Sequence, residues 1–261
     1  MMTVAMGNEL GKPRADIDEE AHRITEEAER RGLTLRLMGG AAIRMLIGAR
    51  LHPAFERTPA DLDFVVAKQD RRATTDLLAE AGYVADEQFN ALNGHRRMLF
   101  NDPEPGRDRQ VDVFVETFEM CHELPLAERL HAVPHTLAPA ELVMTKLQII
   151  SLNAKDRGDL YALLLACDTG GDDDSINVER IAELTAGDWG LQHTFELNLE
   201  RLRAGLEEQS ALDAGERSAI AGRIDAIADA MERAPKSRRW RLRAKIGERK
   251  RWYEEPEEVD R

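Results

Sequence analysis

The sequence predicts an α/β protein: a small mixed sheet with helices over residues 1–136, followed by an all-helical domain over residues 137–261. Two patterns lead to this division. In the first half, short runs rich in Val, Leu and Phe alternate with helical periods, which is typical of a sheet covered by helices. After Pro139 the chain shows only helical periods, rich in Ala, Leu and Glu.

Hydrophobic periods and glycine breakers define the predicted elements. Gly32 and Gly82 stand where helical periods stop, and Gly39–Gly40 separates a short apolar run from the next helix. In the first half we expect helices over 17–31, 41–49 and 70–82 and strands over 33–38, 61–66, 95–100 and 110–116, the last two antiparallel. In the second half we expect helices over 140–155, 156–167, 178–186, 191–209 and 216–233.

The composition and the first residues bear on the cellular location of the protein. No apolar run approaches the roughly 20 residues of a membrane-spanning helix. The first residues lack the basic start and apolar stretch of a secretory signal. Cys121 and Cys167 stand far apart and outside any CxxC pair, so neither a disulfide framework nor a zinc site is indicated. These features predict a cytoplasmic protein without a membrane partner.

Charge is unevenly distributed. The formal net charge of −13 argues against a generic coat for nucleic acid, because phosphate binding needs clustered cations. Residues 233–251, however, hold ten Lys/Arg and one Glu, whereas residues 1–232 carry 25 basic and 43 acidic side chains. Two interpretations of this basic segment stand side by side. It either docks on the acidic body or contacts RNA through Arg238, Arg239, Trp240, Arg241 and Arg243.

A Gly-Gly turn followed by an Asp-x-Asp strand is the central chemical signal. Gly39–Gly40 lets the backbone approach a phosphate at a helix N-terminus, where amide groups and the helix dipole favour an anion. Asp61 and Asp63 lie two residues apart on a strand, so their side chains share a face and can converge on one cation. A hard ion such as Mg²⁺ prefers such oxygen ligands.

A third carboxylate, Asp112, stands inside the apolar strand sequence QVDVFV. Burial of an acid in such a strand costs roughly several kcal/mol of folding free energy unless a neighbouring charge or hydrogen bonds compensate for it. Three acids would allow a two-metal arrangement, in which one ion activates the attacking oxygen and the other holds the triphosphate.

The order GGAAIR, DLDFVV, VDVF resembles the nucleotidyltransferase superfamily of DNA polymerase β, and within it the AbiEii/MenT-type nucleotidyltransferases of bacterial toxin–antitoxin systems. The resemblance covers roughly residues 33–164. It implies that Gly39 and Gly40 bind a nucleoside triphosphate, that Asp61, Asp63 and Asp112 bind Mg²⁺ or Mn²⁺, and that the third acid helps to deprotonate an acceptor hydroxyl. It also implies an RNA acceptor and an antitoxin protein as partner.

Further residues are candidates for nucleotide binding. The resemblance includes a helical lysine followed by a Lys-Asp pair, here Lys146 and then Lys155–Asp156. Lys146 either contacts the triphosphate or reaches the surface from an apolar helix face. Asp156 and Asp159 either serve the site or pair with neighbouring cations. Many members have Ser at the position of Gly40, which leaves more of the phosphate contact here to backbone and to Lys146.

Arg44, Arg57 and Thr58 complete the candidates. Arg57 and Thr58 precede the Asp pair and either reach a phosphate or shape the loop, and Arg44 lies one turn into the helix after Gly40. The predicted function is metal-dependent transfer of a nucleotidyl group from a nucleoside triphosphate to a hydroxyl. Transfer to a small molecule, as in aminoglycoside nucleotidyltransferases, or to a protein remains an alternative. A non-catalytic nucleotide-binding module is the alternative of another class.

Overall fold

The computed structural model, which describes residues 10–255, is built around a five-stranded mixed sheet in the order β1-β2-β5-β4-β3. Only β2 and β5 run parallel, and the other neighbouring pairs are antiparallel. The strands are β1 (Leu35–Met38), β2 (Leu62–Val66), β3 (Val84–Ala85), β4 (Arg97–Asn101) and β5 (Gln110–Val115). The small mixed sheet and its antiparallel pair β4–β5 are therefore confirmed.

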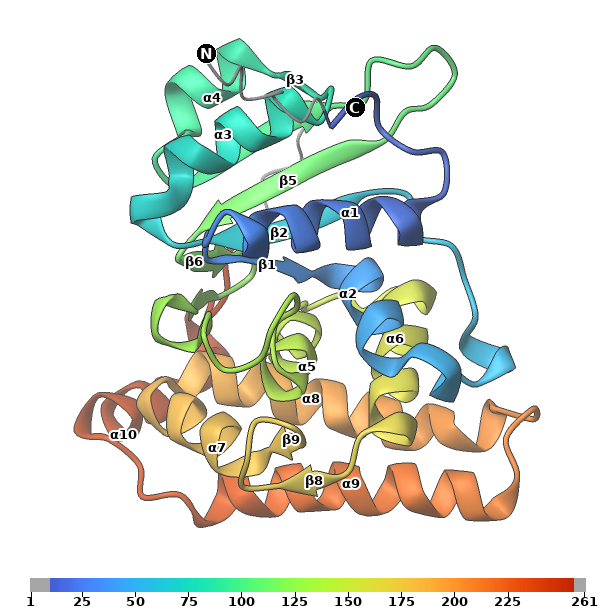
Figure 1. Cartoon of the computed structure of the whole chain (residues 1–261). Helices are drawn as coiled ribbons and strands as arrows, with labels where there is room; N and C mark the ends of the chain where they lie inside the picture. Colours follow the sequence, from blue (N-terminus) through green and yellow to red (C-terminus); the bar gives the residue numbers. More distant parts are fainter. Residues whose placement is uncertain (1–9, 256–261) are drawn as a thin grey trace, which may run out of the picture.

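Four helices accompany the sheet within the described part of the first half: α1 (Ile17–Arg30), α2 (Gly39–Ile47), α3 (Arg71–Glu80) and α4 (Glu87–Asn93). In Figure 1, α1 lies along the sheet, and α3 and α4 lie beyond β5. Side-chain caps start two of them: Asp16 accepts the amide of Glu19 in α1, and Asp86 accepts the amide of Phe89 in α4. The sequence analysis did not predict α4, because its 7 residues, about two turns, are too few to show a period.

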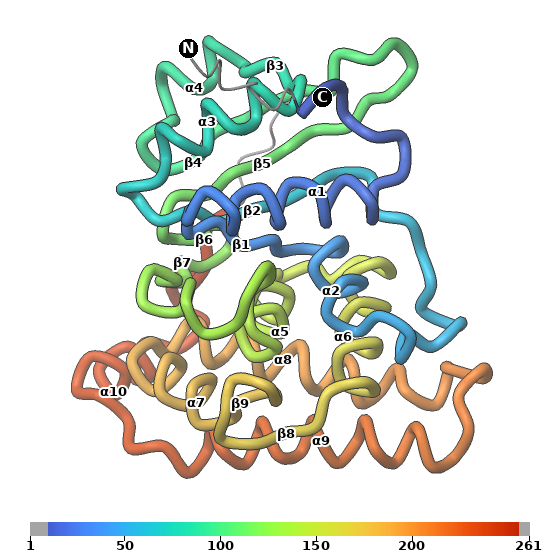
Figure 2. Tube along the Cα trace, in the orientation of Figure 1, coloured from blue at the N-terminus to red at the C-terminus, as the bar shows by residue number. Residues whose placement is uncertain are grey.

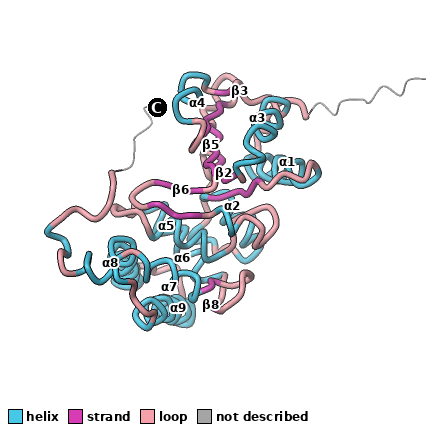
Figure 3. The backbone as a smooth tube through the Cα atoms, turned by 90° about the vertical axis from the view of Figure 1, so that its left-hand side faces the viewer, coloured by secondary structure: helices cyan, strands magenta, loops and turns pink. Residues whose placement is uncertain are grey.

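The second half is largely helical and lies on the other side of α2 from β5 (Figures 1 and 2). Its helices are α5 (Pro139–Leu147), α6 (Ala154–Ala166), α7 (Val178–Gly187), α8 (Trp189–Gly205), α9 (Ala214–Arg233) and α10 (Arg238–Ala244). A two-residue strand pair, β8 (Thr169–Gly170) with β9 (Ile176–Asn177), interrupts them. Seen from the side, the main sheet and the helices α7, α8 and α9 occupy opposite ends of the molecule (Figure 3).

The helix expected over residues 140–155 is broken in the structure, and that expectation is wrong. Helix α5 ends at Leu147, and α6 begins only after Asn153, whose side chain caps it by accepting the amide of Asp156 at 3.0 Å. The side-chain amide of Asn198, in α8, donates to the carbonyls of Leu147 and Ile149, both at 2.8 Å. A tertiary contact thus satisfies the carbonyls that a continuous helix would have used.

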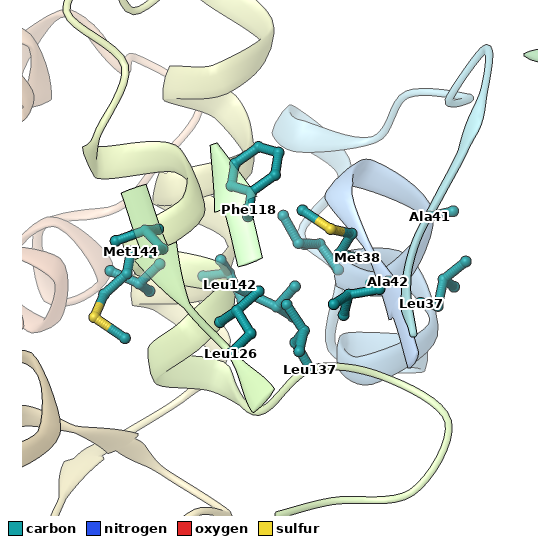
Figure 4. Close-up of a cluster of buried hydrophobic side chains, with 14 of the residues drawn as sticks. Leu37, Met38, Ala41, Ala42, Phe118, Leu126, Leu137, Leu142 and Met144 are labelled. Carbon is teal, nitrogen blue, oxygen red and sulfur yellow. The ribbon is translucent and has the colours of Figure 1, made fainter. Parts of the chain in front are cut away.

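The sheet and the helical half share one core. Residues 135–137 run beside the free edge of β1, where Leu37 donates to the carbonyl of His135 and Leu137 donates to the carbonyl of Leu37. Figure 4 shows the side chain of Met38 on the side of Leu137 and Leu142, whereas the side chain of Leu37 lies on the other side of β1. The hairpin of β6 (Thr117–Glu119) and β7 (Glu123–Pro125) adds Phe118 and Leu124 to the same cluster. None of the helices within residues 10–255 has the length and apolar character needed to cross a bilayer.

Candidate active site

The Gly39–Gly40 pair lies where β1 passes into α2. Gly39 has a φ of +69°, and a β-carbon there would lie 2.2 Å from Oδ2 of Asp63. Glycine is required on both counts, because other residues avoid this φ and the carboxylate occupies the space of a side chain. Met38 makes no side-chain cap, and the first turn of α2 contains no acidic residue. The helix therefore presents backbone amides and a partial positive charge beside Asp63.

The sheet brings the acidic residues together. Asp63 of β2 and Asp112 of β5 are direct partners in the parallel register, so both side chains lie on one face of the sheet. Asp61 precedes β2, and its Oδ1 accepts the backbone amide of Gln110 at 3.1 Å. This contact fastens the start of β2 to the start of β5. The candidate carboxylates thus occupy two adjacent strand ends.

Asp63 is the carboxylate of this group whose pKa is raised. Burial raises the pKa of Asp63 to about 7, and the nearby carboxylates of Asp112 and Asp61 act in the same direction. Lys146 and Arg97 lower it in part. Burial and the neighbouring carboxylates therefore disfavour the charged form of Asp63, and a cation bound beside it would favour that form.

Arg97 is a member of this group that the sequence analysis missed. Its Nε and Nη2 donate to Oδ1 and Oδ2 of Asp112 at 2.7 and 2.5 Å. The guanidinium also lies over the rings of Phe114, at 5.1 Å from the centroid, and Phe89, at 5.7 Å. The only sequence signal was parity: Arg97 faces Phe114 across β4 and β5, and Phe114 shares the face of Asp112.

Two cations, Lys146 of the helical half and Arg57 of the loop before β2, share the carboxylate of Asp159. Lys146 of α5 donates to Oδ1 of Asp156 at 2.8 Å and lies 3.0 Å from Oδ2 of Asp159. Asp159 also accepts two hydrogen bonds from Arg57, at 3.0 and 2.7 Å. The Arg57 guanidinium lies so close to Gly40 that a β-carbon there would be 2.4 Å from its Nη2.

These contacts decide the state of the lysine. Burial alone lowers the pKa of Lys146, but the charges of Asp159 and Asp156 outweigh burial and raise it overall. Lys146 is therefore a protonated, largely buried cation whose side chain is only 13% exposed. Lys155, the other lysine of the motif, is exposed at the start of α6.

Two candidates lie apart from this group. Arg44 makes a forked contact with Asp18 of α1, with Nε to Oδ1 at 3.0 Å and Nη2 to Oδ2 at 2.6 Å. It also donates to the backbone carbonyl of Arg57 at 2.9 Å, so it holds the loop that carries Arg57. Thr58 is exposed on that loop. The structure therefore gives Arg44 a supporting position rather than one at the carboxylates.

The carboxylate oxygens of the site are ligands that suit Mg²⁺ or Mn²⁺, but several of them already accept hydrogen bonds from the protein. Asp63 and Asp112 offer carboxylate oxygens whose repulsion a cation would relieve. Across residues 10–255, however, no three His, Cys, Asp or Glu side chains gather into a cluster that could hold a metal ion. Both oxygens of Asp112 are engaged by Arg97, and Asp61 accepts a backbone amide. A metal ion at Asp112 or Asp61 would therefore compete with these contacts.

In the basic C-terminal segment, the tryptophans contact the protein body and most of the cationic side chains face solvent. Trp252 donates to Thr194 of α8 at 3.0 Å, and Trp240 donates to Gln192 at 3.1 Å. Cationic side chains of the same segment face solvent: Arg238, Arg239, Arg241, Lys245, Arg249 and Lys250. The aromatic rings thus anchor the segment to α8, and most of the arginines and lysines cover its outer surface.

Comparisons with known proteins give only distant similarities. No family model matches the chain, and no curated protein is similar to it in sequence. The solution structure of the antibiotic-resistance factor ANT(2'')-Ia is similar with a TM-score of 0.34 and 13% identity, over 81% of this chain and 92% of that chain. The crystal structure of an antigenic nucleotidyltransferase-like protein from Paracoccidioides brasiliensis is similar with a TM-score of 0.41 and 13% identity, over 87% and 96%. Similarity at this level does not identify a family.

Proposed function

We propose that this chain transfers a nucleoside monophosphate from a nucleoside triphosphate to a hydroxyl group. The observation that carries the proposal is the contact between Gly39 and Asp63: a helix N-terminus with free space only for glycine, directly beside a carboxylate that is in register with Asp112. A phosphate anion suits the helix N-terminus, and a metal-bridged phosphate suits the carboxylates.

The triphosphate would lie between the glycine pair and two cations, Arg57 of the loop before β2 and Lys146 of α5. Arg57 lies next to Gly40, and Lys146 acts electrostatically on Asp63. Both cations are held by Asp159, which fixes their positions before a ligand arrives. Preorganised charges of this kind stabilise a phosphoryl-transfer transition state without the cost of reorganisation.

In the reaction, the acceptor oxygen forms a bond to the α-phosphorus, and the bond from that phosphorus to the bridging oxygen of the β-phosphate breaks. Pyrophosphate leaves with the electron pair, and Asp112 accepts the hydroxyl proton, directly or through water. Mg²⁺ or Mn²⁺, which Asp61, Asp63 and Asp112 would hold, would neutralise charge on the phosphates and lower the pKa of the attacking hydroxyl. The protein contributes mainly position, which can account for about 7–11 kcal/mol of a barrier.

We further propose RNA as the acceptor, as in the AbiEii/MenT-type toxins that the motif order resembles, with action in the cytoplasm and control by an antitoxin. The support is the outer surface of the C-terminal segment, where Arg238, Arg239 and Arg241 face solvent. Exposed arginines suit a phosphate backbone. The indole N–H groups of Trp240 and Trp252 are used in contacts with α8, so the contact with RNA would be mainly to phosphates and largely independent of sequence.

Label transfer tests the proposal. Purified protein with Mg²⁺, total RNA and each α-labelled nucleoside triphosphate should label RNA and release pyrophosphate. The Asp61→Asn/Asp63→Asn variant should do neither, whereas Asp76→Asn, which changes an exposed carboxylate on α3, should match the wild type. Pyrophosphate release without labelled RNA would move the acceptor to a small molecule or a protein. Nucleotide binding without any release would favour a non-catalytic module.

The acceptor surface has its own test. An Arg238→Gln/Arg239→Gln/Arg241→Gln variant should bind RNA more weakly and with a flatter dependence on salt, because each neutralised phosphate contact lowers the slope by about one. Unchanged affinity and slope would remove the C-terminal segment from the RNA-binding surface.

A further inference from the structure

We infer that Arg97 is an internal counter-ion that occupies Asp112 in the metal-free protein and must be displaced before a divalent cation binds there. The inference rests on the proposed metal-dependent function. Its first support is geometric, because the forked contact uses both oxygens of Asp112. A forked arginine–carboxylate pair is among the strongest hydrogen-bonded contacts that proteins form. A cation that coordinates Asp112 has to compete with it.

The balance of charge gives the second support. Among the cations near the carboxylates, Lys146 pairs with Asp156 and Asp159, and Arg57 pairs with Asp159. Arg97 instead pairs with Asp112. A divalent ion beside Asp63 and Asp112 would neutralise the same charge and would also repel the guanidinium. A metal ion and the Arg97 guanidinium therefore compete for Asp112, and binding of either one weakens binding of the other.

The guanidinium also has a place to remain once the carboxylate turns away. Phe89 of α4 and Phe114 of β5 offer their ring faces to it, and Phe114 is held edge-on by Phe118 with centroids 4.8 Å apart. Cation–π contacts of this kind keep a charge in a partly exposed position without a carboxylate. The Arg97 side chain is 24% exposed, so water can also reach it. Release of Asp112 thus requires only local rotation of side chains.

A different role for the same contact predicts the opposite result. If Arg97 only held Asp112 in its metal-binding orientation, then removal of the guanidinium would weaken metal binding. If Arg97 competes with the metal, then removal strengthens it. The sign of the change in metal affinity therefore separates the two roles without reference to catalysis.

The test is a titration of the full chain with Mn²⁺, followed by electron paramagnetic resonance without nucleotide. Arg97→Gln should bind Mn²⁺ about tenfold more tightly than the wild type, the order expected when one charge a few ångströms from a divalent ion is removed. Arg96→Gln is the matched control, because it removes the same charge from the preceding, exposed residue. It should bind Mn²⁺ within about twofold of the wild type, because its charge is more exposed to solvent.

Arg97→Lys keeps the charge but loses the fork, and it should bind Mn²⁺ with an affinity between those of the wild type and Arg97→Gln. It also keeps the test decisive if Arg97→Gln does not fold. Equal or weaker Mn²⁺ binding by the folded Arg97 variants, with normal binding by the wild type, would overturn the inference and leave the metal site in place. An absence of Mn²⁺ binding in the wild type and every variant would overturn both the metal site and this inference.

Discussion

Replacement of Gly39 by alanine tests the contact on which the site depends. The new β-carbon would lie 2.2 Å from Oδ2 of Asp63, and the residue would have to keep a φ of +69°. The backbone term costs about 1–2 kcal/mol for a residue other than glycine. The steric term forces the carboxylate to move by about 1 Å to reach an ordinary carbon–oxygen contact, and a shift of that size in a catalytic group can cost about a hundredfold in rate.

Gly32→Ala separates the two terms. Gly32 has nearly the same φ, +70°, but no atom lies within 4 Å of its would-be β-carbon, so only the backbone term applies. Urea unfolding should therefore show a loss of about 1–2 kcal/mol for Gly32→Ala and a larger loss for Gly39→Ala. Transfer of the labelled nucleotide should fall only in Gly39→Ala. Equal losses of stability, with full activity in both variants, would refute the importance of the contact.

Three further outcomes follow from the charged contacts. The pKa of Asp63 in the folded protein, about 7, exceeds its unfolded value, so protonation of Asp63 stabilises the fold at low pH. As the pH rises from 4 through 7, the metal-free wild type should therefore lose up to about 4 kcal/mol of stability, whereas Asp63→Asn should not. Equal pH profiles of the two proteins in denaturant titrations would contradict this. Lys146→Met should cost about 3 kcal/mol in urea unfolding, because it leaves the buried carboxylate of Asp156 without its cation and removes one of the two cations at Asp159. Lys155→Met, at an exposed position, should change stability by less than about 0.5 kcal/mol, and similar losses in the two variants would contradict the ion-pair argument. Arg44→Gln should cost about 1 kcal/mol through its contact with Asp18 yet keep nucleotide affinity in a filter-binding assay, and a large loss of affinity would return Arg44 to the nucleotide site.

Much of the sheet could be predicted because its signals are local. Glycines mark the ends of α1 and α3, and the apolar runs around Asp63 and Asp112 are too short for helices and rich in β-branched or aromatic residues. Side-chain parity placed Asp61 and Asp63 on one face of their strand. The parallel register that makes Asp63 and Asp112 direct neighbours depends on tertiary structure. From the sequence, only the resemblance to a known family indicated that these acids lie together.

The remaining features depend on contacts between distant segments. The break after Leu147 is made by Asn198, about fifty residues later, and no local pattern shows it. The partner of Arg44 is Asp18 of α1, and the partner of Asp112 is Arg97 on a neighbouring strand. Each involves a long, flexible side chain that can reach several carboxylates, so its choice is fixed only when the fold brings the partners together.

The measurement that tests the proposed activity most directly compares the fate of two labels on the same nucleoside triphosphate. With wild-type protein, Mg²⁺ and an RNA acceptor, the α-phosphate label should enter the acceptor and the γ-phosphate label should leave as pyrophosphate, and both events should disappear in Asp63→Asn and in Asp112→Asn. Transfer of the γ-label, or transfer of the α-label that survives both substitutions, would contradict nucleotidyl transfer at these carboxylates.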